Sequence, residues 1–587
     1  IPRELGNCSS LVTLSLDGNL LHGSIPRELC NAPLLSQLFL NKNLLSGTME
    51  HTFKNCSSMS DIEVNGNKLS GGIPAYFADL DGLISLGLDG NLLSGPIPDA
   101  IWASKSLMEF SARNNRLVGG LSPRVGTLTI LNQLCLDHNM LQGEIPSQLG
   151  LLANLTTLTL SFNAFSGSIP PQLGGCSQLA TLDLGHNQLS GGIPAEIGML
   201  RSLDCLDLSH NRLHGPIPTE ICSISNDFSM PDSMFTQHFG VLDLSFNHLN
   251  GTIPAHIGKC KVLINLLLQH NHLSGTIPEE LSQLLNLITL DLSSNDLVGN
   301  IPHQLGGLHQ LQGLNLAYNE VSGEIPLELG EIHSLVKLNI SHNRLYGSLP
   351  PSLGKLDGLT HLDVSFNELG GEIPLQYAQM VSIVGLFLNQ NQLNGSINGL
   401  LMESIDWHQV QSLDLSNNSF DGEIPKSIGN LSSLSYLDLH NNGFSGPIPV
   451  EISTLSQLEY LDLSGNILDG EISQPLCEIL TLTFLNLSGN KLVGRVPNFG
   501  TCAKLLPSSY LNNAGLCGDE PMLSHCIIRQ QQRHANALVS PGAVLGIISG
   551  LLIACFCIIT TYLRRKMVNN SSNTSINNVD IEKRKLN

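Results

Sequence analysis

Histidines recur in one slot of a repeated sequence, directly before an asparagine. They are His138, His186, His210, His270 and His342. Imidazole is a common zinc ligand, and it also titrates between about pH 5 and 8. The same slot elsewhere holds unrelated residues, namely Phe162, Phe246, Tyr318 and Gly465. A slot this tolerant does not indicate a ligand set, so we predict no metal and no cofactor here. A pH-sensitive surface is the alternative interpretation.

Signatures of catalysis are missing from the sequence. None of the 20 histidines is followed by glutamate, which excludes the H-E-x-x-H zinc motif. The Gly-Lys pairs at 258–259 and 354–355 lack the earlier glycine of a phosphate-binding loop. No H-R-D, D-F-G or A-P-E kinase element occurs. We therefore predict that this chain is not an enzyme and has no catalytic residue.

A repeated sequence unit covers most of the chain, so any binding residues must be positioned by this repeat. The pattern L-x-x-L-x-L-x-x-N places an asparagine at 19, 43, 67 and on to 490, and the interval is 24 residues except at two places. The interval is 36 residues from Asn211 to Asn247 and 27 from Asn391 to Asn418. The L-x-L core alternates with period two and predicts a short strand in every repeat. Strands that recur in the same direction must stack as a parallel sheet, and one coil cannot bury its leucines without its neighbours.

The full unit, L-x-x-L-x-L-x-x-N-x-L-x-G-x-I-P-x-x-L-G-x-L, resembles the plant leucine-rich repeat. The resemblance covers residues 1–498, about 20 repeats, with a loop-out at 222–240. It implies a solenoid with a parallel β-sheet on the concave face and 3-10 or short helical turns on the convex face. Glycine and proline in the unit fit tight turns, and the asparagine amide can bond backbone groups inside the turn.

Acidic residues dominate the charge balance. The net charge of −21 argues against a nucleic-acid partner. Several aspartates occupy one outward strand position of their repeats: Asp183, Asp207, Asp243, Asp291, Asp363, Asp414, Asp438 and Asp462. Solubility is one interpretation of this row. The other is an acidic concave face that favours a basic protein partner.

Glycosylation sequons and cysteines indicate the compartment. Nine N-x-S/T sequons fall before residue 500, at Asn7, Asn55, Asn154, Asn250, Asn339, Asn394, Asn417, Asn430 and Asn486. On the convex segment we expect free buried thiols at Cys8, Cys30, Cys56, Cys176, Cys222, Cys260 and Cys477. The spacing of Cys517 and Cys526 resembles the C-terminal cap of plant repeat receptors, and this resemblance implies a disulfide between them, with Cys502 as a competitor for either partner.

The two ends of the chain differ. Residues 499–526 form the predicted cap and 527–540 a juxtamembrane linker. The uncharged run 543–563 predicts a transmembrane helix at 541–563, followed by a cytosolic tail at 564–587 that starts with Arg564, Arg565 and Lys566. A stripe of small residues favours contact between membrane helices: Gly542, Gly546, Gly550 and Ala554. The chain opens in mid-coil without a signal peptide or the family's N-terminal cap, so we expect a fragment at its start.

Departures from the template mark the candidate binding residues. Before Asn163 the strands carry varied outward side chains, and we predict ligand contacts at Phe39, Asp61, Glu63, Glu109, Arg113 and Asp137. Twelve extra residues before Asn247 must loop out of the stack. They are rich in large side chains, and we predict contacts at Phe228, Met230, Met234, Phe235 and His238.

The stretch M-P-D-S-M-F-T-Q-H-F-G-V-L-D-L-S, 230–245, resembles the receptor kinases of the excess-microsporocytes and multiple-sporocyte type. That resemblance implies a plasma-membrane, single-pass receptor with extracellular repeats. It implies a secreted peptide or small cysteine-rich protein as ligand, a shorter leucine-rich-repeat co-receptor kinase as partner, and a serine/threonine kinase in the full-length product. The alternative is a kinase-less receptor-like protein that acts in defence or development through a partner kinase.

Overall fold

The computed structural model describes residues 1–222, 240–402, 407–504, 506–518 and 526. The chain divides into two compact units, Ile1–Leu523 and Ser524–Asn587. Of the second unit only Cys526 is described, so every described helix and strand belongs to the first unit. The predicted membrane span at 541–563 and its small-residue stripe lie outside the described residues.

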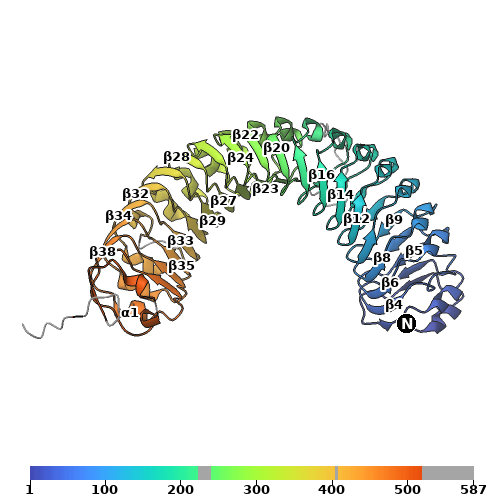
Figure 1. Cartoon of the computed structure of the whole chain (residues 1–587), viewed down its shortest axis with the longest axis horizontal. Coiled ribbons are helices and arrows are strands. Elements are labelled where there is room, and N and C mark those ends of the chain that lie inside the picture. Colours follow the sequence, from blue (N-terminus) through green and yellow to red (C-terminus); the bar gives the residue numbers. More distant parts are fainter. Residues whose placement is uncertain (223–239, 403–406, 505, 519–525, 527–587) are drawn as a thin grey trace, which may run out of the picture. The chain divides into compact units, whose positions relative to one another are not determined.

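One parallel sheet of 20 short strands runs through the first unit, with one strand from each coil. Its strands line the inner side of the curve (Figure 1). They are β1 (Thr13–Ser15), β3 (Gln37–Phe39), β5 (Asp61–Glu63), β7 (Ser85–Gly87), β9 (Glu109–Ser111), β11 (Gln133–Cys135), β13 (Thr157–Thr159), β15 (Thr181–Asp183), β17 (Cys205–Asp207), β19 (Val241–Asp243), β21 (Asn265–Leu267), β23 (Thr289–Asp291), β25 (Gly313–Asn315), β27 (Lys337–Asn339), β29 (His361–Asp363), β31 (Gly385–Phe387), β33 (Ser412–Asp414), β35 (Tyr436–Asp438), β37 (Tyr460–Asp462) and β39 (Phe484–Asn486).

A second strand follows in each coil, from β2 (His22–Gly23) to β38 (Ile467–Asp469), and pairs in parallel with its neighbours along one flank. In most coils a 3-10 helix comes next, from η1 (Arg3–Asn7) to η18 (Val450–Thr454), and one short α-helix, α1 (Gln474–Cys477), lies near the end. The repeat's I-P proline stands directly before most of these helices in extended conformation, as Pro254 does at φ −67°. The predicted concave sheet and convex turns are therefore confirmed.

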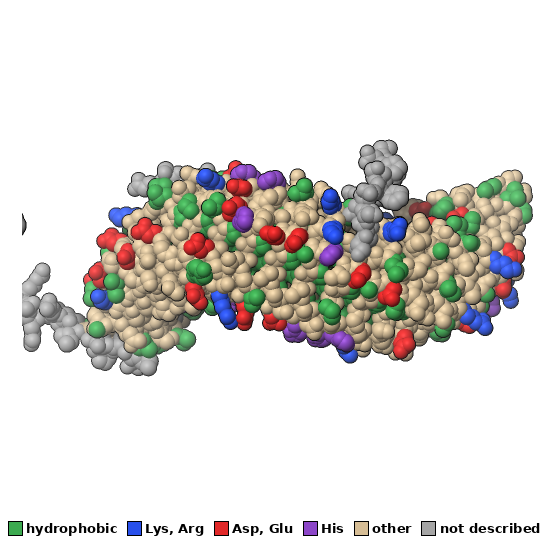
Figure 2. Space-filling view, turned by 90° about the horizontal axis from the view of Figure 1, so that it is seen from above, with side chains coloured by type: hydrophobic (Ala, Val, Ile, Leu, Met, Phe, Trp, Pro, Cys, Tyr) green, Lys and Arg blue, Asp and Glu red, His purple; other side chains and the backbone are tan. Residues whose placement is uncertain are grey.

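The core is a set of leucine columns that only stacking can bury. Leu182 and Leu184, which flank the outward Asp183 on β15, both have 0% exposure. A buried leucine contributes about 1.5–3 kcal/mol relative to an exposed one, so each added coil stabilises the coils beside it. Figure 2 views the outer side, where charged side chains of both signs lie scattered among hydrophobic ones.

The repeated asparagine joins consecutive coils, and Asn187 is representative. Its Nδ2 donates to Leu184 O (3.1 Å) and Gly185 O (3.1 Å) in its own coil and to Leu160 O (3.0 Å) in the coil before. Its Oδ1 accepts the N–H of Phe165 at 3.0 Å. The amide thus pairs backbone groups that the turn would otherwise bury without partners, as the sequence predicted.

The insertions leave this ladder intact. At an ordinary rung the bridged carbonyl lies 27 residues earlier, as for Asn187 and Leu160. At Asn247 it is Leu208 O, 39 residues earlier, and at Asn418 it is Leu388 O, 30 residues earlier. The asparagine therefore still bonds to the preceding coil at both insertions, and Cys205 on β17 pairs directly with Val241 on β19.

The ladder extends one rung beyond the last predicted repeat. Nδ2 of Asn513 donates to Leu487 O (2.9 Å), and its Oδ1 accepts the N–H of Leu492 (3.0 Å). Two short strands, β40 (Val493–Arg495) and β41 (Gly515–Cys517), pair in parallel beside it. The predicted cap region thus begins as a degenerate coil.

The expectation of free thiols on the convex segment is wrong for most of these cysteines. Disulfides join Cys30 to Cys56, Cys222 to Cys260 and Cys477 to Cys502. Adjacent coils bring the paired Cα atoms to 4.6, 5.4 and 5.1 Å, which is within disulfide reach. Cys502 therefore does not compete for the cap. Cys8 and Cys176 are free thiols, but Cys8 is exposed. Cys517 and Cys526 are both disulfide-bonded, and their mutual pairing stays a prediction.

Candidate functional site

The outward side chains of the main sheet form straight columns because the strands stay in register. One column carries Asp183, Asp207 and Asp243 on three adjacent strands, and further along it carries Asp414, Asp438 and Asp462. The predicted common position of the aspartates is therefore confirmed. Two acidic clusters result, because Leu267, Asn315, Asn339 and Phe387 interrupt the column between them and leave Asp291 and Asp363 as single aspartates.

These aspartates also stabilise their own turns. Oδ1 of Asp207 accepts the N–H of Ser209 at 2.8 Å, and Oδ1 of Asp414 accepts the N–H of Ser416 at 3.0 Å. Burial, together with a smaller effect of nearby aspartates, raises the pKa of Asp183 and of Asp414 to about 6. The clusters are thus partly structural, and their charge depends on pH in the mildly acidic range.

A polar network covers the concave face of the first coils, where the sequence predicted ligand contacts. Oγ of Ser85 donates to Glu63 at 2.8 Å and contacts Glu109 at 3.2 Å. The Glu63 carboxylate lies over Gly87, where an added Cβ would come within 2.0 Å of it. Burial raises the pKa of Glu63. The glycine therefore makes room for an acidic group that the flanking strands hold in place.

The same network contains a cationic centre. Nε of Arg113 lies 3.1 Å from Oδ1 of Asp137, and its backbone N–H donates to Asp89 at 2.7 Å. Asp89 was missed in the sequence because it stands in an ordinary L-D-G-N turn. Its signal was the 24-residue spacing that places it beside Arg113. Burial raises the pKa of Asp89, although hydrogen bonds from Ser111 and Arg113 oppose this.

The structure thus brings most of the predicted patch together. Asp61 and Glu63 lie on β5, Glu109 on β9, and Asp61 accepts a hydrogen bond from Gln37 at 3.2 Å. Phe39 pairs in register with Glu63 on the neighbouring strand. The predicted contacts at Phe228, Met230, Met234, Phe235 and His238 lie outside the described residues.

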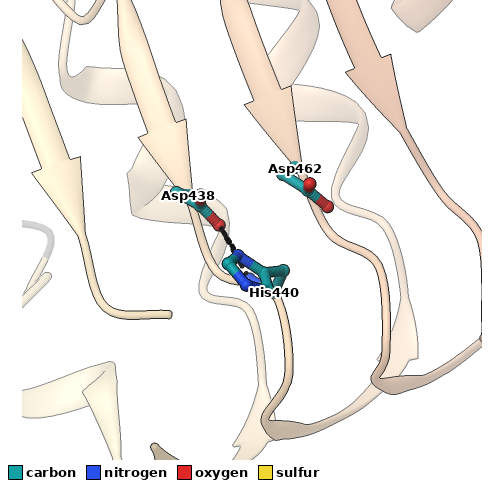
Figure 3. A group of neighbouring side chains, drawn as sticks. All are labelled: Asp438, His440 and Asp462. Carbon is teal, nitrogen blue, oxygen red and sulfur yellow. Dashed lines mark hydrogen bonds and ion pairs between the residues drawn. The ribbon is translucent and has the colours of Figure 1, made fainter. Parts of the chain in front are cut away.

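On the last coils the sequence indicated Asp438 and Asp462 but not His440, which forms a cluster with them (Figure 3). Nδ1 of His440 lies 2.6 Å from Oδ1 of Asp438, and one ligand atom from each of these residues and Asp462 falls within a 4.8 Å group. Beside them the rings of Tyr436, Tyr460 and Phe484 stack at 4.4 and 4.3 Å. The 24-residue spacing of the aromatic residues was the available signal.

Metal binding does not follow from this cluster. One imidazole and two carboxylates suit zinc by type. However, Oδ1 of Asp438 already accepts the N–H of His440 (3.0 Å), and Asp462 accepts hydrogen bonds from Ser464 (2.9 Å) and Asn486 (3.1 Å). Internal donors therefore already hold the carboxylate oxygens. The cluster combines buried acids with aromatic rings, a surface that suits a cationic or aromatic ligand group.

The histidine slot is a stack of rings at the edge of the concave face. His138, Phe162, His186, His210, Phe246 and His270 stack in that order, with centroid distances of 4.2, 3.9, 4.0, 4.1 and 4.3 Å. All six have φ between 50° and 55°, so the slot is a left-handed turn. Parallel rings point their nitrogens side by side rather than at one centre. Burial lowers the pKa of His186 and His210, so they are mostly neutral near pH 7.

Comparison with known proteins agrees with this geometry. Leucine Rich Repeat models match residues 10–32, 154–176, 178–200, 202–224, 240–260, 262–284, 286–308, 334–356, 359–373, 408–468 and 481–502. The structure of the Arabidopsis receptor kinase HAESA, in complex with the peptide hormone IDA and the co-receptor SERK1, is 32% identical with a TM-score of 0.76. The match covers 89% of each chain. The plant peptide hormone receptor RGFR1, in complex with RGF2, is 31% identical with a TM-score of 0.70, and the match covers 88% of this chain and 92% of that one.

The chain belongs to the plant leucine-rich-repeat receptor ectodomains. A third member, the ectodomain of the Arabidopsis thaliana membrane receptor kinase GASSHO1/SCHENGEN3 in complex with CASPARIAN STRIP INTEGRITY FACTOR 2, is 32% identical with a TM-score of 0.58. That match covers 90% of this chain and 70% of the other. No curated protein sequence matches at a significant level.

In this ectodomain, no helix of the described residues has both the length and the apolar character needed to cross a bilayer. The described coils end in the degenerate coil at Asn513, and the concave face carries the polar network of the first coils and the two acidic clusters at Asp183–Asp207–Asp243 and Asp414–Asp438–Asp462. The ectodomain therefore offers three places on one sheet where a ligand can make specific contacts.

Proposed function

We propose that this ectodomain is the recognition part of a cell-surface receptor and binds a secreted peptide or small cysteine-rich protein on its concave face. A shorter leucine-rich-repeat co-receptor kinase completes the complex, and a receptor kinase carries the signal inward. The observation that carries this proposal is the match over 89% of both chains to a receptor ectodomain in complex with a peptide hormone and a co-receptor.

The chemistry of the concave face favours a basic ligand. The acidic columns at Asp183–Asp207–Asp243 and Asp414–Asp438–Asp462 present carboxylates on adjacent strands. Such a surface attracts a ligand with lysine, arginine or a free amino group. The aromatic stack beside Asp438 supplies apolar contact area for the same ligand. We place the receptor in the excess-microsporocytes type, on the support of the sequence at 230–245.

A location at the plasma membrane, with the repeats outside, fits the covalent chemistry. The three disulfides between adjacent coils suit an oxidising compartment. Six of the nine sequon asparagines are exposed, as glycosylation requires.

Binding of secreted peptides and small cysteine-rich proteins to the full chain, measured by isothermal calorimetry, tests the proposal. We expect Tyr460→Ala and the pair Glu63→Gln with Glu109→Gln each to weaken binding about tenfold, because each removes ligand contacts from one cluster. Glu331→Gln, an exposed convex position at the end of η13 (Leu327–Glu331), is the control and should leave affinity unchanged. Unchanged affinity in both concave variants would contradict a concave binding site.

A further inference from the structure

A groove runs along the flank of the middle coils, outside the main sheet. Thr219 of one coil and residues of the next five coils, between Thr252 and Pro351, line it. Its floor contains one proline per coil, Pro254, Pro278, Pro302, Pro326 and Pro350, above isoleucines that are 3–4% exposed at Ile253, Ile277, Ile301 and Ile325. Coils repeat about every 4.8 Å, so the groove is on the order of 20 Å long. That length holds about six residues of extended chain.

The groove is acidic. Glu279, Glu280, Glu324 and Glu328 line it, and none of its described lining residues is lysine or arginine. Glu280 lies in the first turn of η11 (Glu279–Gln283), and Glu328 in the first turn of η13. The Glu324 side chain packs against Gly347, where an added Cβ would come within 2.9 Å of its Cγ. His256, His303 and Tyr346 are the other titratable groups of the lining. The carboxylates therefore face the groove without cationic partners in its wall.

One end of the groove is apolar. Leu327 is 60% exposed and Tyr346 is 51% exposed, and both line the groove near Pro350. Large apolar side chains left in water beside a proline floor provide an anchor for another apolar side chain. The acidic wall and the apolar end together indicate a partner segment that has both basic and apolar side chains.

We propose that this flank groove is a second binding surface, which takes a basic, extended segment of a partner protein, about six residues long. Lysine or arginine side chains of the segment pair with Glu280, Glu324 and Glu328. An apolar side chain of the segment packs against Leu327 and Tyr346. The surface is separate from the concave ligand site, so a partner can bind here while a ligand occupies the sheet.

The test uses the full chain and a fluorescent peptide of alternating lysine, proline and leucine, measured by fluorescence anisotropy. We expect the triple variant Glu280→Gln, Glu324→Gln and Glu328→Gln to weaken binding about tenfold, and Tyr346→Ala to weaken it several-fold. The matched control is Glu144→Gln, Glu196→Gln and Glu372→Gln. Glu144 and Glu372 precede I-P as Glu324 does, and Glu196 lies in a first helical turn as Glu280 does.

A tenfold loss in the groove variant, with the control variant within twofold of the parent chain, supports the proposal. Equal loss in both variants would mean that net charge alone attracts the peptide, and it would overturn the proposal. So would undetectable binding to the parent chain, or tight binding of the same peptide with glutamate in place of lysine. A groove variant that changes only self-association in sedimentation would assign the groove to a second copy of this chain instead.

Discussion

The carboxylate of Asp414 has a structural role as well as a place on the concave face. Its Oδ1 accepts hydrogen bonds from the backbone N–H (3.0 Å) and the hydroxyl (2.7 Å) of Ser416, and its side chain is buried. Asp438 stands next to it in register, so two acids share a partly dry environment. A carboxyl group in such an environment binds its proton more tightly than a carboxyl group exposed to water.

A pH dependence of stability follows from this residue. Burial raises the pKa of Asp414 to about 6, whereas an unfolded aspartate titrates near about 3.9. Between these values the folded state binds more protons, so stability falls as pH rises from about 4 to 6 and stays lowered above that range. We expect the urea midpoint of the parent chain to fall more between pH 5 and 7 than that of Asp414→Asn, which keeps the acceptor oxygen. Asp421→Asn, on an exposed side chain, is the control; identical pH profiles for the parent chain and Asp414→Asn would contradict this assignment.

Prediction from sequence worked best for residues that depart from the repeat. Glu63, Glu109 and Arg113 were predicted because their strands lack the usual residues of the repeat, and the structure places them in one network. Asp89 was not predicted because its sequence context matches the repeat. Its role depends on Arg113, which lies 24 residues later and donates a backbone hydrogen bond to it. Predicting side-chain networks between coils therefore requires the register of the strands as well as the residue types.

At the scale of elements, the disulfide between Cys222 and Cys260 spans the 12-residue insertion. These cysteines are 38 residues apart, and Cys30 and Cys56 are 26 apart. The difference equals the insertion, so both pairs join equivalent slots of adjacent coils. The spacings of 26 and 38 residues therefore predict both pairs once the cysteines are compared by their slots in the repeat.

This disulfide joins the coils on either side of the insertion. We expect Cys222→Ser with Cys260→Ser to destabilise the chain by about 2–4 kcal/mol, because the bond closes a loop of the unfolded chain. The loss should appear as faster hydrogen exchange at β18 (Arg212–Gly215) and β20 (His248–Thr252), which flank the insertion. Mass spectrometry of exchanged peptides measures it.

Cys8→Ser is the control for that experiment, because Cys8 is a free, exposed thiol. If hydrogen exchange at β18 and β20 in the double variant matches that of the parent chain, the asparagine rung alone holds the two coils together. Asn247 could do so through its bonds to Leu208 and Leu213. The two variants therefore separate the contribution of the covalent bond from that of the ladder.

At the scale of the whole molecule, the sequons mark which faces can carry glycans. Asn7, Asn55, Asn154, Asn250, Asn394 and Asn430 are exposed, whereas Asn339, Asn417 and Asn486 are half-buried. Asn339 and Asn486 belong to strands of the main sheet. Their Oδ1 atoms accept hydrogen bonds from Ser341 (2.8 Å) and Ser488 (2.8 Å), which are the hydroxyl residues of the same sequons.

A glycan on the main sheet would conflict with the packing and with a concave ligand site. The Nδ2 of Asn486, the atom that a glycan would occupy, donates to Asp462 at 3.1 Å. We therefore expect high occupancy at the six exposed sequons and little at Asn339 and Asn486, measured by site-resolved glycopeptide mass spectrometry of chain secreted from plant cells. Asn486→Gln should leave the glycan mass unchanged, whereas Asn250→Gln should lower it by one glycan. Full occupancy at both sheet positions would place sugars across the concave face, and the ligand would then have to bind elsewhere, on the flank or the convex side.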